Sequence, residues 1–307
     1  MKSIIESIKR HKIKAVILEK NNAQHILIKG DCGDVIKHIP AGSIDLIITD
    51  PPYNKGLDYG KFNDSKPWAE YYKWLREKLI EIPRILSDKG SFYLISYPEI
   101  NARLMPFLEE ELGLNYRRWI TWHYPTNIGH SSKNYTRSQR TILFFTKTKR
   151  DYIFNREHLV QHYKNPTATV IRRRLAEGSK GRTSYDLLRF LDMIELQNGL
   201  IDTLDIDLLK NNSKDRFRNL KGKFHPMELK ELRKKDHPCQ LPLGLLELFV
   251  KVSSNKGDIV FDPFAGTFTT SVAAGKYGRN SLGIELNQKF VDFGRKRIKM
   301  LQHGQKT

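Results

Sequence analysis

The chain has 307 residues, enough to bury a sizeable core in one large domain or in one domain that carries a smaller insert. Its 53 Lys and Arg residues outnumber 34 Asp and Glu residues, and the formal net charge of +19 favours a polyanionic partner. The two cysteines, Cys32 and Cys239, have no companion Cys or His at the spacing of a zinc site, so we expect no metal centre and two ordinary thiols.

The N-terminal stretch is basic and helix-prone. Its longest apolar run, residues 15–18, is much too short for the core of a signal peptide or for a membrane span. We therefore expect a cytoplasmic protein without a membrane partner.

Short apolar runs rich in β-branched residues alternate with amphipathic segments from about residue 25 to residue 147. This alternation is typical of a parallel sheet covered by helices. We expect strands at residues 25–29, 44–49, 91–96, 117–122 and 141–146. Between two of them, apolar side chains spaced alternately by three and four residues predict one helix face despite Pro83. These side chains are Tyr72, Leu75, Leu79, Ile82 and Leu86.

The alternation stops at about residue 151, which predicts an inserted module over residues 151–236. One stripe of apolar residues at helical spacing, namely Leu187, Phe190, Leu191 and Ile194, favours a largely helical insert. The insert is basic, and its candidate DNA-binding residues are Arg172, Arg173, Arg174, Lys180, Arg182, Arg216 and Arg218. Taken alone, such runs are often only solvated surface.

The α/β pattern returns over residues 237–307. We expect a helix with Pro242 near its start, a strand at residues 258–261, a helix from about Thr267 and a strand at residues 281–284. The first of these helices would bury Leu245, Leu246, Phe249 and Val252. A final helix would carry Phe290, Phe293, Arg297 and Leu301.

Four acidic residues each follow a predicted strand: Asp31, Asp50, Asp262 and Glu285. In an open parallel sheet, ligands bind outside the carboxyl ends of the strands, at a switch in strand order. Any one of these acids, taken alone, would more often be a helix cap or a turn residue. Four at the same edge predict a binding site.

The first motif at this edge is Asp50-Pro51-Pro52-Tyr53. Two consecutive prolines fix two φ angles and remove two backbone donors, so the nearby carbonyls remain available as acceptors. The lone pair of an aromatic amino group is delocalised into its ring, and acceptors on both hydrogens would draw the nitrogen towards sp³. Asp50 and the Pro51 carbonyl can supply these acceptors, and Tyr53 offers a face for a flipped-out base. The plain alternative is a proline-stiffened turn.

The second motif is a strand that enters a turn of small residues and then a helix; it comprises Asp262, Pro263, Phe264, Ala265, Gly266 and Thr267. Gly266 permits close approach of the backbone, and the free amides of a helix N-terminus favour a carboxylate. Glu285, followed by Leu286 and Asn287, stands about where a nucleotide-binding fold places the acid that accepts from ribose hydroxyls.

These motifs resemble the amino methyltransferases of bacterial restriction-modification systems, which share the signature (Asp/Asn/Ser)-Pro-Pro-(Tyr/Phe/Trp). The resemblance covers nearly all of the chain outside the insert, and the order of catalytic loop, insert and cofactor loop is that of the β class. It implies a Rossmann-like, doubly wound, mostly parallel sheet. Residues 1–150 would be the catalytic half, 151–236 the target-recognition region and 237–307 the cofactor-binding half.

The resemblance also implies S-adenosylmethionine as cofactor and double-stranded DNA as substrate, and it admits a homodimer and a cognate restriction endonuclease as partners. Asp50, Pro51, Pro52 and Tyr53 would form the catalytic loop, and the second motif with Glu285, Leu286 and Asn287 would hold the cofactor. Asp31 and Cys32 would contact the adenine of the cofactor, and Asp50 would also lie beside the cofactor. The methionine end of the cofactor would be flanked by His237, Pro238 and Gln240. Asp at the first loop position favours adenine N6 over cytosine N4.

Beside a base-modifying site, the basic insert would neutralise phosphates and read guanine edges. Methylation of RNA or of a protein amide is a second interpretation. A catalytically impaired DNA-binding homologue is a third, because the family pattern Phe-x-Gly-x-Gly has Phe268 in place of its second glycine. Phe268 either turns into the core or crowds the cofactor. Trp122, His123 and Tyr124 could line a base pocket, whereas sheet packing is favoured for Trp119.

Overall fold

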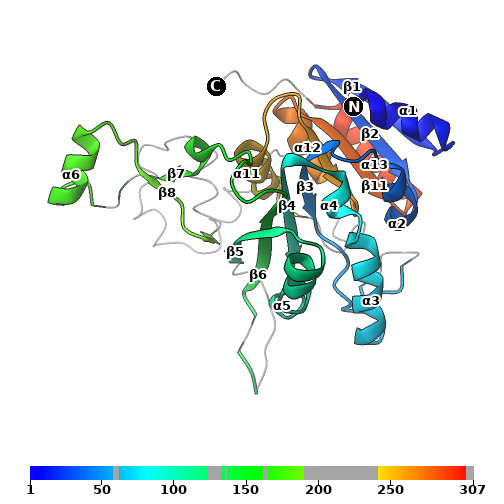
Figure 1. Cartoon of the computed structure of the whole chain (residues 1–307), viewed down its shortest axis with the longest axis horizontal. Coiled ribbons are helices and arrows are strands. Elements are labelled where there is room, and N and C mark those ends of the chain that lie inside the picture. The colour runs from blue at the N-terminus through cyan, green and yellow to red at the C-terminus, as the bar shows by residue number, and fades with distance from the viewer. Residues whose placement is uncertain are drawn as a thin grey trace, which may run out of the picture.

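A nine-stranded sheet runs through the protein, seen here in a computed structural model that describes residues 1–57, 62–123, 133–135, 137–161, 163, 165–189 and 241–301. The strand order is β1-β2-β11-β10-β3-β4-β6-β5-β9 (Figure 1). The pairs β1/β2, β4/β6 and β5/β6 are antiparallel, and the other neighbours are parallel. This arrangement confirms the predicted mostly parallel α/β sheet.

The strands expected before the insert are all present, and β3 has the predicted bounds. The strands are β1 (Ala15–Lys20), β2 (Ala23–Lys29), β3 (Ile44–Thr49), β4 (Leu86–Ser96), β5 (Asn115–His123), β6 (Gln139–Thr146), β9 (Leu187–Arg189), β10 (Ile259–Asp262) and β11 (Asn280–Glu285). Strand β1 was not predicted from the sequence. It forms a hairpin with β2 because Asn21 and Asn22 both adopt positive φ, at 56° and 58°, as a tight two-residue turn requires.

Helices cover both faces of the sheet. One face carries α1 (Lys2–Arg10), α2 (Cys32–Val35), α3 (Trp68–Leu79), α4 (Ile82–Ile85) and α5 (Pro98–Pro106). The other carries α11 (Leu243–Ser253), α12 (Thr269–Lys276) and α13 (Gln288–Lys299). Successive side chains of β3 point to opposite faces of the sheet. Ile47 packs in the core with α1 to α5, and Leu46 and Ile48 pack in the core with α11 and α12. Within the described ranges, none of the helices is long and apolar enough to cross a membrane.

The prediction of a single helix face from Tyr72 to Leu86 is wrong. Helix α3 ends at Leu79, α4 begins at Ile82, and Leu86 already belongs to β4. Proline lacks a backbone donor and is tolerated in the first turn of a helix, so the helix restarts with Pro83 in that turn. The fully buried side chains are Tyr71, Leu75, Leu79, Ile82 and Ile85.

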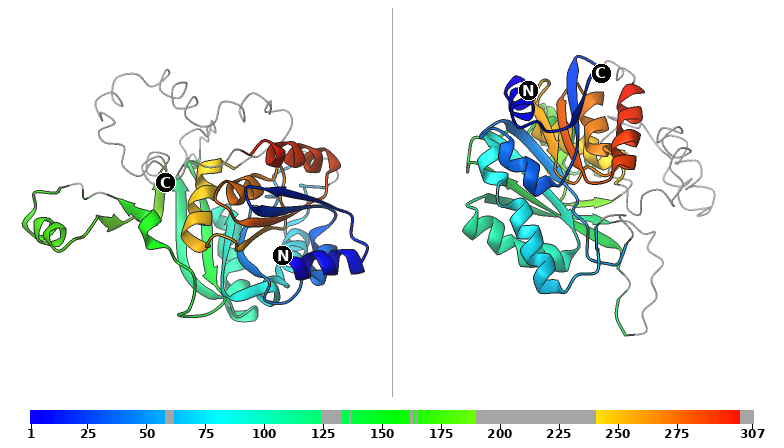
Figure 2. Two further views of the ribbon diagram at one scale, coloured as in Figure 1. Left: turned by 90° about the horizontal axis from the view of Figure 1, so that it is seen from above. Right: turned by 90° about the vertical axis from the view of Figure 1, so that its right-hand side faces the viewer.

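The described part of the insert leaves the sheet and returns to its edge. The short strands β7 (Val160–Gln161) and β8 (Arg182–Thr183) pair with each other and carry α6 (Thr169–Ala176) at the end of an arm (Figures 1 and 2). The chain then forms β9, parallel to β5. The helical stripe predicted from Leu187 is therefore wrong at its start, because Leu187 lies in β9; Phe190, Leu191 and Ile194 lie outside the described residues.

The strand order reverses between β3 and β10. From β3 the chain crosses outward to its neighbour β4, and from β10 it crosses in the opposite direction to β11. The loops after β3 and β10 therefore diverge and leave a crevice at the carboxyl ends of these strands. Asp50 follows β3 and Asp262 ends β10, so both acids lie at this switch point.

Candidate active site

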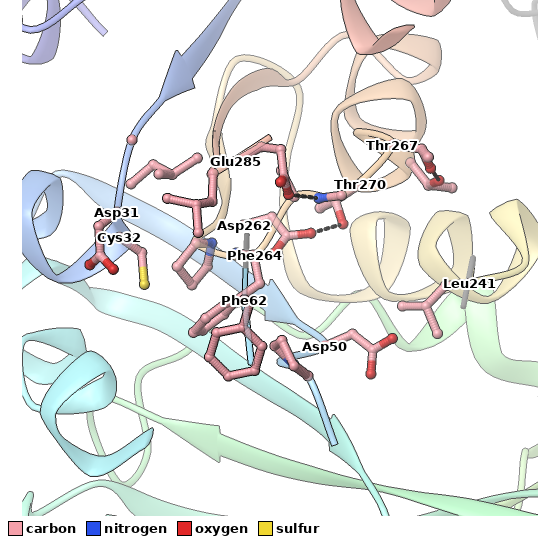
Figure 3. A pocket seen from close by; sticks show the side chains of 18 of the residues that line it. Asp31, Cys32, Asp50, Phe62, Leu241, Asp262, Phe264, Thr267, Thr270 and Glu285 are labelled. Carbon is pink, nitrogen blue, oxygen red and sulfur yellow. Dashed lines mark hydrogen bonds between the residues drawn. The ribbon is translucent and has the colours of Figure 1, made fainter. Parts of the chain in front are cut away.

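A pocket opens at the switch point and is lined by all four acids predicted from the sequence (Figure 3). Asp31 and Asp50 lie on opposite sides of the view, with Asp262 and Glu285 between them. The pocket also contains the predicted residues Cys32, Pro52, Pro263, Phe264, Ala265, Gly266, Thr267 and Leu286. The structure therefore brings together side chains from opposite ends of the chain.

Glu285 ties the glycine turn to the end of β11. Its Oε2 accepts from the backbone N–H of Gly266 at 2.9 Å, and its Oε1 accepts from that of Asn287 at 2.7 Å. Burial raises the pKa of Glu285 to about 7, although these backbone donors act in the opposite direction. Each carboxylate oxygen keeps a second lone pair, so Glu285 can still accept from a pair of hydroxyl groups in the pocket.

Asp262 is buried at the centre of the pocket. Its Oδ1 accepts from the backbone N–H of Phe264 at 3.0 Å, and its Oδ2 accepts from the Thr270 hydroxyl at 2.7 Å. Burial, with a smaller contribution from the nearby carboxylates of Asp50 and Glu285, raises its pKa to about 7, although the hydrogen bonds from Thr270 and Phe264 act in the opposite direction. Burying several acids together is costly unless a cation lies among them, so the pocket suits a positively charged ligand.

The far end of the pocket has an acid and an aromatic wall. Asp31 caps α2 by accepting from the N–H of Gly33 at 2.7 Å, and Lys78 Nζ donates to it at 2.5 Å. The ring of Trp74 lies 4.6 Å from that of Phe62 and 5.8 Å from that of Phe264, measured between centroids. This wall suits a planar heterocycle. Burial, reinforced by Asp31, raises the pKa of the Cys32 thiol to about 12, so this cysteine is unreactive.

Asp50 is half-buried where β3 ends, and its carboxylate is part of a hydrogen-bond chain. The Tyr53 hydroxyl donates to Asp50 Oδ1, and Arg140 Nη1 donates to the Tyr53 hydroxyl at 2.6 Å. Burial raises the pKa of Asp50 to about 6, while the Arg140 charge and the Tyr53 hydrogen bond lower it. Asp50 is thus ionised at neutral pH with one oxygen engaged by Tyr53.

The proline loop presents fewer acceptors, and a different tyrosine surface, than the sequence suggested. The Pro52 carbonyl accepts from the Tyr71 hydroxyl at 2.7 Å, which leaves the Pro51 carbonyl as the candidate acceptor beside Asp50. The Tyr53 ring is 1% exposed and lies 4.8 Å from the Tyr97 ring between centroids. In this arrangement, Tyr53 does not offer the pocket the open stacking face that we predicted.

Asp64 organises the loop after Tyr53, a role that was not predicted from the sequence. Its carboxylate is buried and accepts from the backbone N–H groups of Asn54, Lys55 and Leu57 at 2.7, 3.0 and 3.0 Å. Asn54 adopts a positive φ of 57°, which turns the chain sharply after the catalytic loop. Arg140, Tyr71 and Lys78 were also missed, because they reach the site from distant elements and belong to no local motif.

The other candidate residues lie on the arm of the insert, in the packed sheet or outside the described residues. Arg172, Arg173 and Arg174 are exposed on α6, Lys180 is exposed beyond it, and the Arg182 guanidinium lies 3.8 Å from the Tyr185 ring centroid. Trp119 packs against the core as favoured, and Trp122 is buried. Outside the described residues lie Tyr124, Arg216, Arg218, His237, Pro238 and Gln240.

Phe268 turns into the core and does not line the pocket. Its backbone is left-handed, with φ 61°, and its ring is fully buried among Leu27, Val272, Val291 and their neighbours. The ring occupies space left by two glycines: a Cβ on Gly283 would lie 2.6 Å from Phe268 Cε1, and one on Gly294 would lie 2.3 Å from Phe268 Cδ2. The pocket is therefore preserved at the cost of a strained backbone.

We expect Gly294→Ala to destabilise the protein although Gly294 lies inside α13, where alanine is the better helix former by about 1 kcal/mol. The added methyl group would collide with the Phe268 ring, and overpacking of a core costs about 1–3 kcal/mol. In a Phe268→Gly background the same change should become stabilising, because the ring is gone. Thermal unfolding of the two single variants and the double variant tests this; independent, additive effects would contradict the packing argument.

Comparisons with known proteins agree on one kind of enzyme. A family model described as DNA methylase matches residues 44–296. The chain is 28% identical to the Type II methyltransferase M.HpaI of Haemophilus parainfluenzae, over 89% of this chain and 73% of that protein. It is 29% identical to the DNA adenine methyltransferase YhdJ of Escherichia coli, over 92% and 85% of the two chains.

Solved structures show the same fold. PvuII DNA methyltransferase, described as cytosine-N4-specific, superimposes with a TM-score of 0.61 at 17% identity, over 94% of this chain and 91% of that one. M1.HpyAVI in complex with SAM superimposes with a TM-score of 0.53 at 18% identity, over 89% and 98%.

Proposed function

The chain belongs to the DNA methylase family, whose members methylate exocyclic amino groups, and we propose that it methylates adenine N6 in duplex DNA at a specific sequence. The observation that carries the proposal is the position of Asp50, an ionised acid at the rim of a pocket lined by Asp31, Asp262 and Glu285. Asp at this loop position and the likeness to an adenine methyltransferase favour adenine. Cytosine N4 is the second candidate, since a structural neighbour has that specificity.

The cofactor is S-adenosylmethionine, which supplies a strongly electrophilic methyl group on its sulfonium. The pocket suits this molecule because it combines carboxylates for positive charge, an aromatic wall for adenine and a glycine turn at a helix start. We assign Glu285 to the ribose hydroxyls, Asp31 to the adenine end, and Gly266 with Thr267 to the methionine end. Phe268 lies in the core, so the reason for considering an impaired homologue is removed.

The protein's contribution to the reaction is alignment and exclusion of water. Asp50 Oδ1 is engaged by Tyr53, so Oδ2 and the Pro51 carbonyl would accept the two amino hydrogens of the target base. In that position the amino nitrogen would face the methyl group that S-adenosylmethionine supplies, and it would give up one proton when it takes that group. Asp50, with a pKa of about 6, can receive that proton and release it to solvent.

Sequencing of modified bases in DNA from cells that express the chain tests the proposal. We expect N6-methyladenine at one recognition sequence, and none in cells that express the Asp50→Ala variant. N4-methylcytosine in its place would move the assignment to cytosine. Unmodified DNA from cells that contain folded protein would refute DNA methylation by this chain.

We expect neutralisation of Arg172, Arg173 and Arg174 to weaken DNA binding and to flatten its salt dependence. All three are exposed on α6, away from the pocket, and each lost phosphate contact should reduce the slope by about 0.9 logarithmic units. The dissociation constant for a cognate duplex, measured at several salt concentrations, gives that slope.

Arg295, Lys296 and Lys299, exposed on α13, provide a matched control that removes the same charge elsewhere. Cofactor affinity should stay unchanged in both triple variants. Parallel salt plots for wild type and the α6 variant would show that these arginines are solvated surface.

A further inference from the structure

Arg140 is a buried cation beside the catalytic loop. It lies in β6, whose first residues reach the carboxyl edge of the sheet because β6 runs antiparallel to β4. The side chain is 9% exposed, and its guanidinium carbon lies 4.5 Å from the Tyr53 ring centroid, 5.5 Å from that of Tyr97 and 6.0 Å from that of Trp122. Burying a guanidinium costs free energy unless the charge is compensated, so a buried arginine beside Asp50 indicates a specific interaction with the catalytic loop.

The direction of the hydrogen-bond chain follows from the chemistry of its members. Arginine has no acceptor, so the Tyr53 hydroxyl must accept from Arg140 Nη1. The single hydroxyl hydrogen of Tyr53 is then directed to Asp50 Oδ1. Because Oδ1 already accepts this hydrogen, a proton on Asp50 is favoured on Oδ2, the oxygen proposed to accept the amino hydrogen of the base.

We propose that Arg140 is a positioning residue that acts through the Tyr53 hydroxyl to keep Asp50 an oriented carboxylate with Oδ2 free to accept. This inference rests on the proposed methyl transfer at Asp50. Without the charge of Arg140, a proton would remain on Oδ2 at neutral pH and block the acceptor. Among the described residues, the other ionisable groups that act near Asp50 do not replace Arg140, because Asp262 of β10 is an acid and Tyr71 of α3 is a neutral phenol whose pKa is raised by burial.

The test compares Arg140→Gln with Arg137→Gln. Arg137 is a matched control: its guanidinium lies 4.1 Å from the Tyr97 centroid and donates to Glu99 at 2.8 Å, but no hydrogen bond joins it to Tyr53 in the described structure. We expect the pH midpoint of single-turnover methylation to rise from about 6 in wild type to about 7 or above in Arg140→Gln. For a midpoint of about 7 the rate should fall about threefold at pH 6.5, and at pH 9 it should return to that of the control.

Two further measurements separate this role from structural damage and from failure of the proposed function. Carbon-13 NMR of aspartate carboxyl groups, with Asp50→Asn for assignment, should show the same rise in the Asp50 pKa without any need for activity. Tyr53→Phe should raise that pKa as well, and Arg140→Gln should add little in the Tyr53→Phe background.

An Asp50 pKa that is the same in Arg140→Gln and wild type would overturn the inference. An equal shift of the Asp50 pKa in the Arg137→Gln control would overturn it too. So would additive effects of Tyr53→Phe and Arg140→Gln on that pKa. If Arg140→Gln does not fold, the Asp50 pKa in Tyr53→Phe tests the inference alone. An unshifted Asp50 pKa in that variant would refute the proposed link from Arg140 through Tyr53 to Asp50. Absence of DNA methylation by wild type would refute the proposed function, while the NMR titration would still test the link from Arg140 to Asp50.

Discussion

Replacing Asp50 with alanine should slow DNA methylation at least about a hundredfold and leave cofactor affinity within about threefold of wild type. The change removes the carboxylate that follows β3 and that the Tyr53 hydroxyl holds in place. The cofactor contacts assigned to Glu285, Asp31 and the glycine turn come from other loops and should persist. Single-turnover kinetics and calorimetry measure the two quantities separately.

The control for this prediction is Asp88→Ala, because Asp88 is exposed near the amino end of β4, at the opposite edge of the sheet. Its rate should match wild type. The wild-type rate should also rise with pH through about 6, since Asp50 must be ionised to accept. An Asp50→Ala enzyme that keeps more than about a tenth of wild-type turnover would exclude Asp50 as the main acceptor.

Replacing Glu285 with alanine should raise the cofactor dissociation constant by about tenfold to a hundredfold. Two effects combine: the ribose hydroxyls lose a charged acceptor, and the backbone donors of Gly266 and Asn287 lose the partner that holds the pocket wall. Glu285→Gln should raise the cofactor dissociation constant nearly as much. Both carboxylate oxygens accept from N–H groups, so an amide NH₂ would have to face one of those donors.

Calorimetry at pH 8 measures this effect on an ionised carboxylate, because the pKa of Glu285 is about 7. Wild-type affinity should fall as the pH drops below 7, where the carboxyl group takes up a proton. Asp292→Ala, a change at an exposed acid on α13, should leave affinity unaltered. Unchanged affinity in Glu285→Ala would mean that another residue holds the ribose.

The four acids could be found from the sequence because each depends on a local pattern. An apolar strand followed at once by an acid places that acid at the carboxyl edge, wherever the strand lies in the sheet. The order of the strands was not needed to group Asp31, Asp50, Asp262 and Glu285. The bounds of β3 were predicted because both of its faces are buried and Ile44, Leu46, Ile47 and Ile48 are apolar, with only Asp45 between them.

Contacts between distant segments could not be predicted. Arg140 reaches Tyr53 only because β6 inserts antiparallel between β4 and β5, and nothing near Arg140 in sequence distinguishes it from other arginines. Leu187 lies in a strand because it pairs with Thr121 at the edge of the sheet, which overrides the helical spacing of its neighbours. The role of Asp64 depends on three backbone N–H groups, of Asn54, Lys55 and Leu57, that converge on its carboxylate only in the folded loop.

The packing of Phe268 restricts the order in which this part of the protein can have evolved. An aromatic ring at position 268 requires that positions 283 and 294 carry no side chain, since a methyl group at either would overlap the ring. With glycine at position 268, a methyl group at position 294 would no longer meet the aromatic ring, which supplies its three nearest neighbours in the present structure. The two glycines therefore had to be present when the phenylalanine arose, and each can now be replaced only together with a residue that is distant from it in sequence.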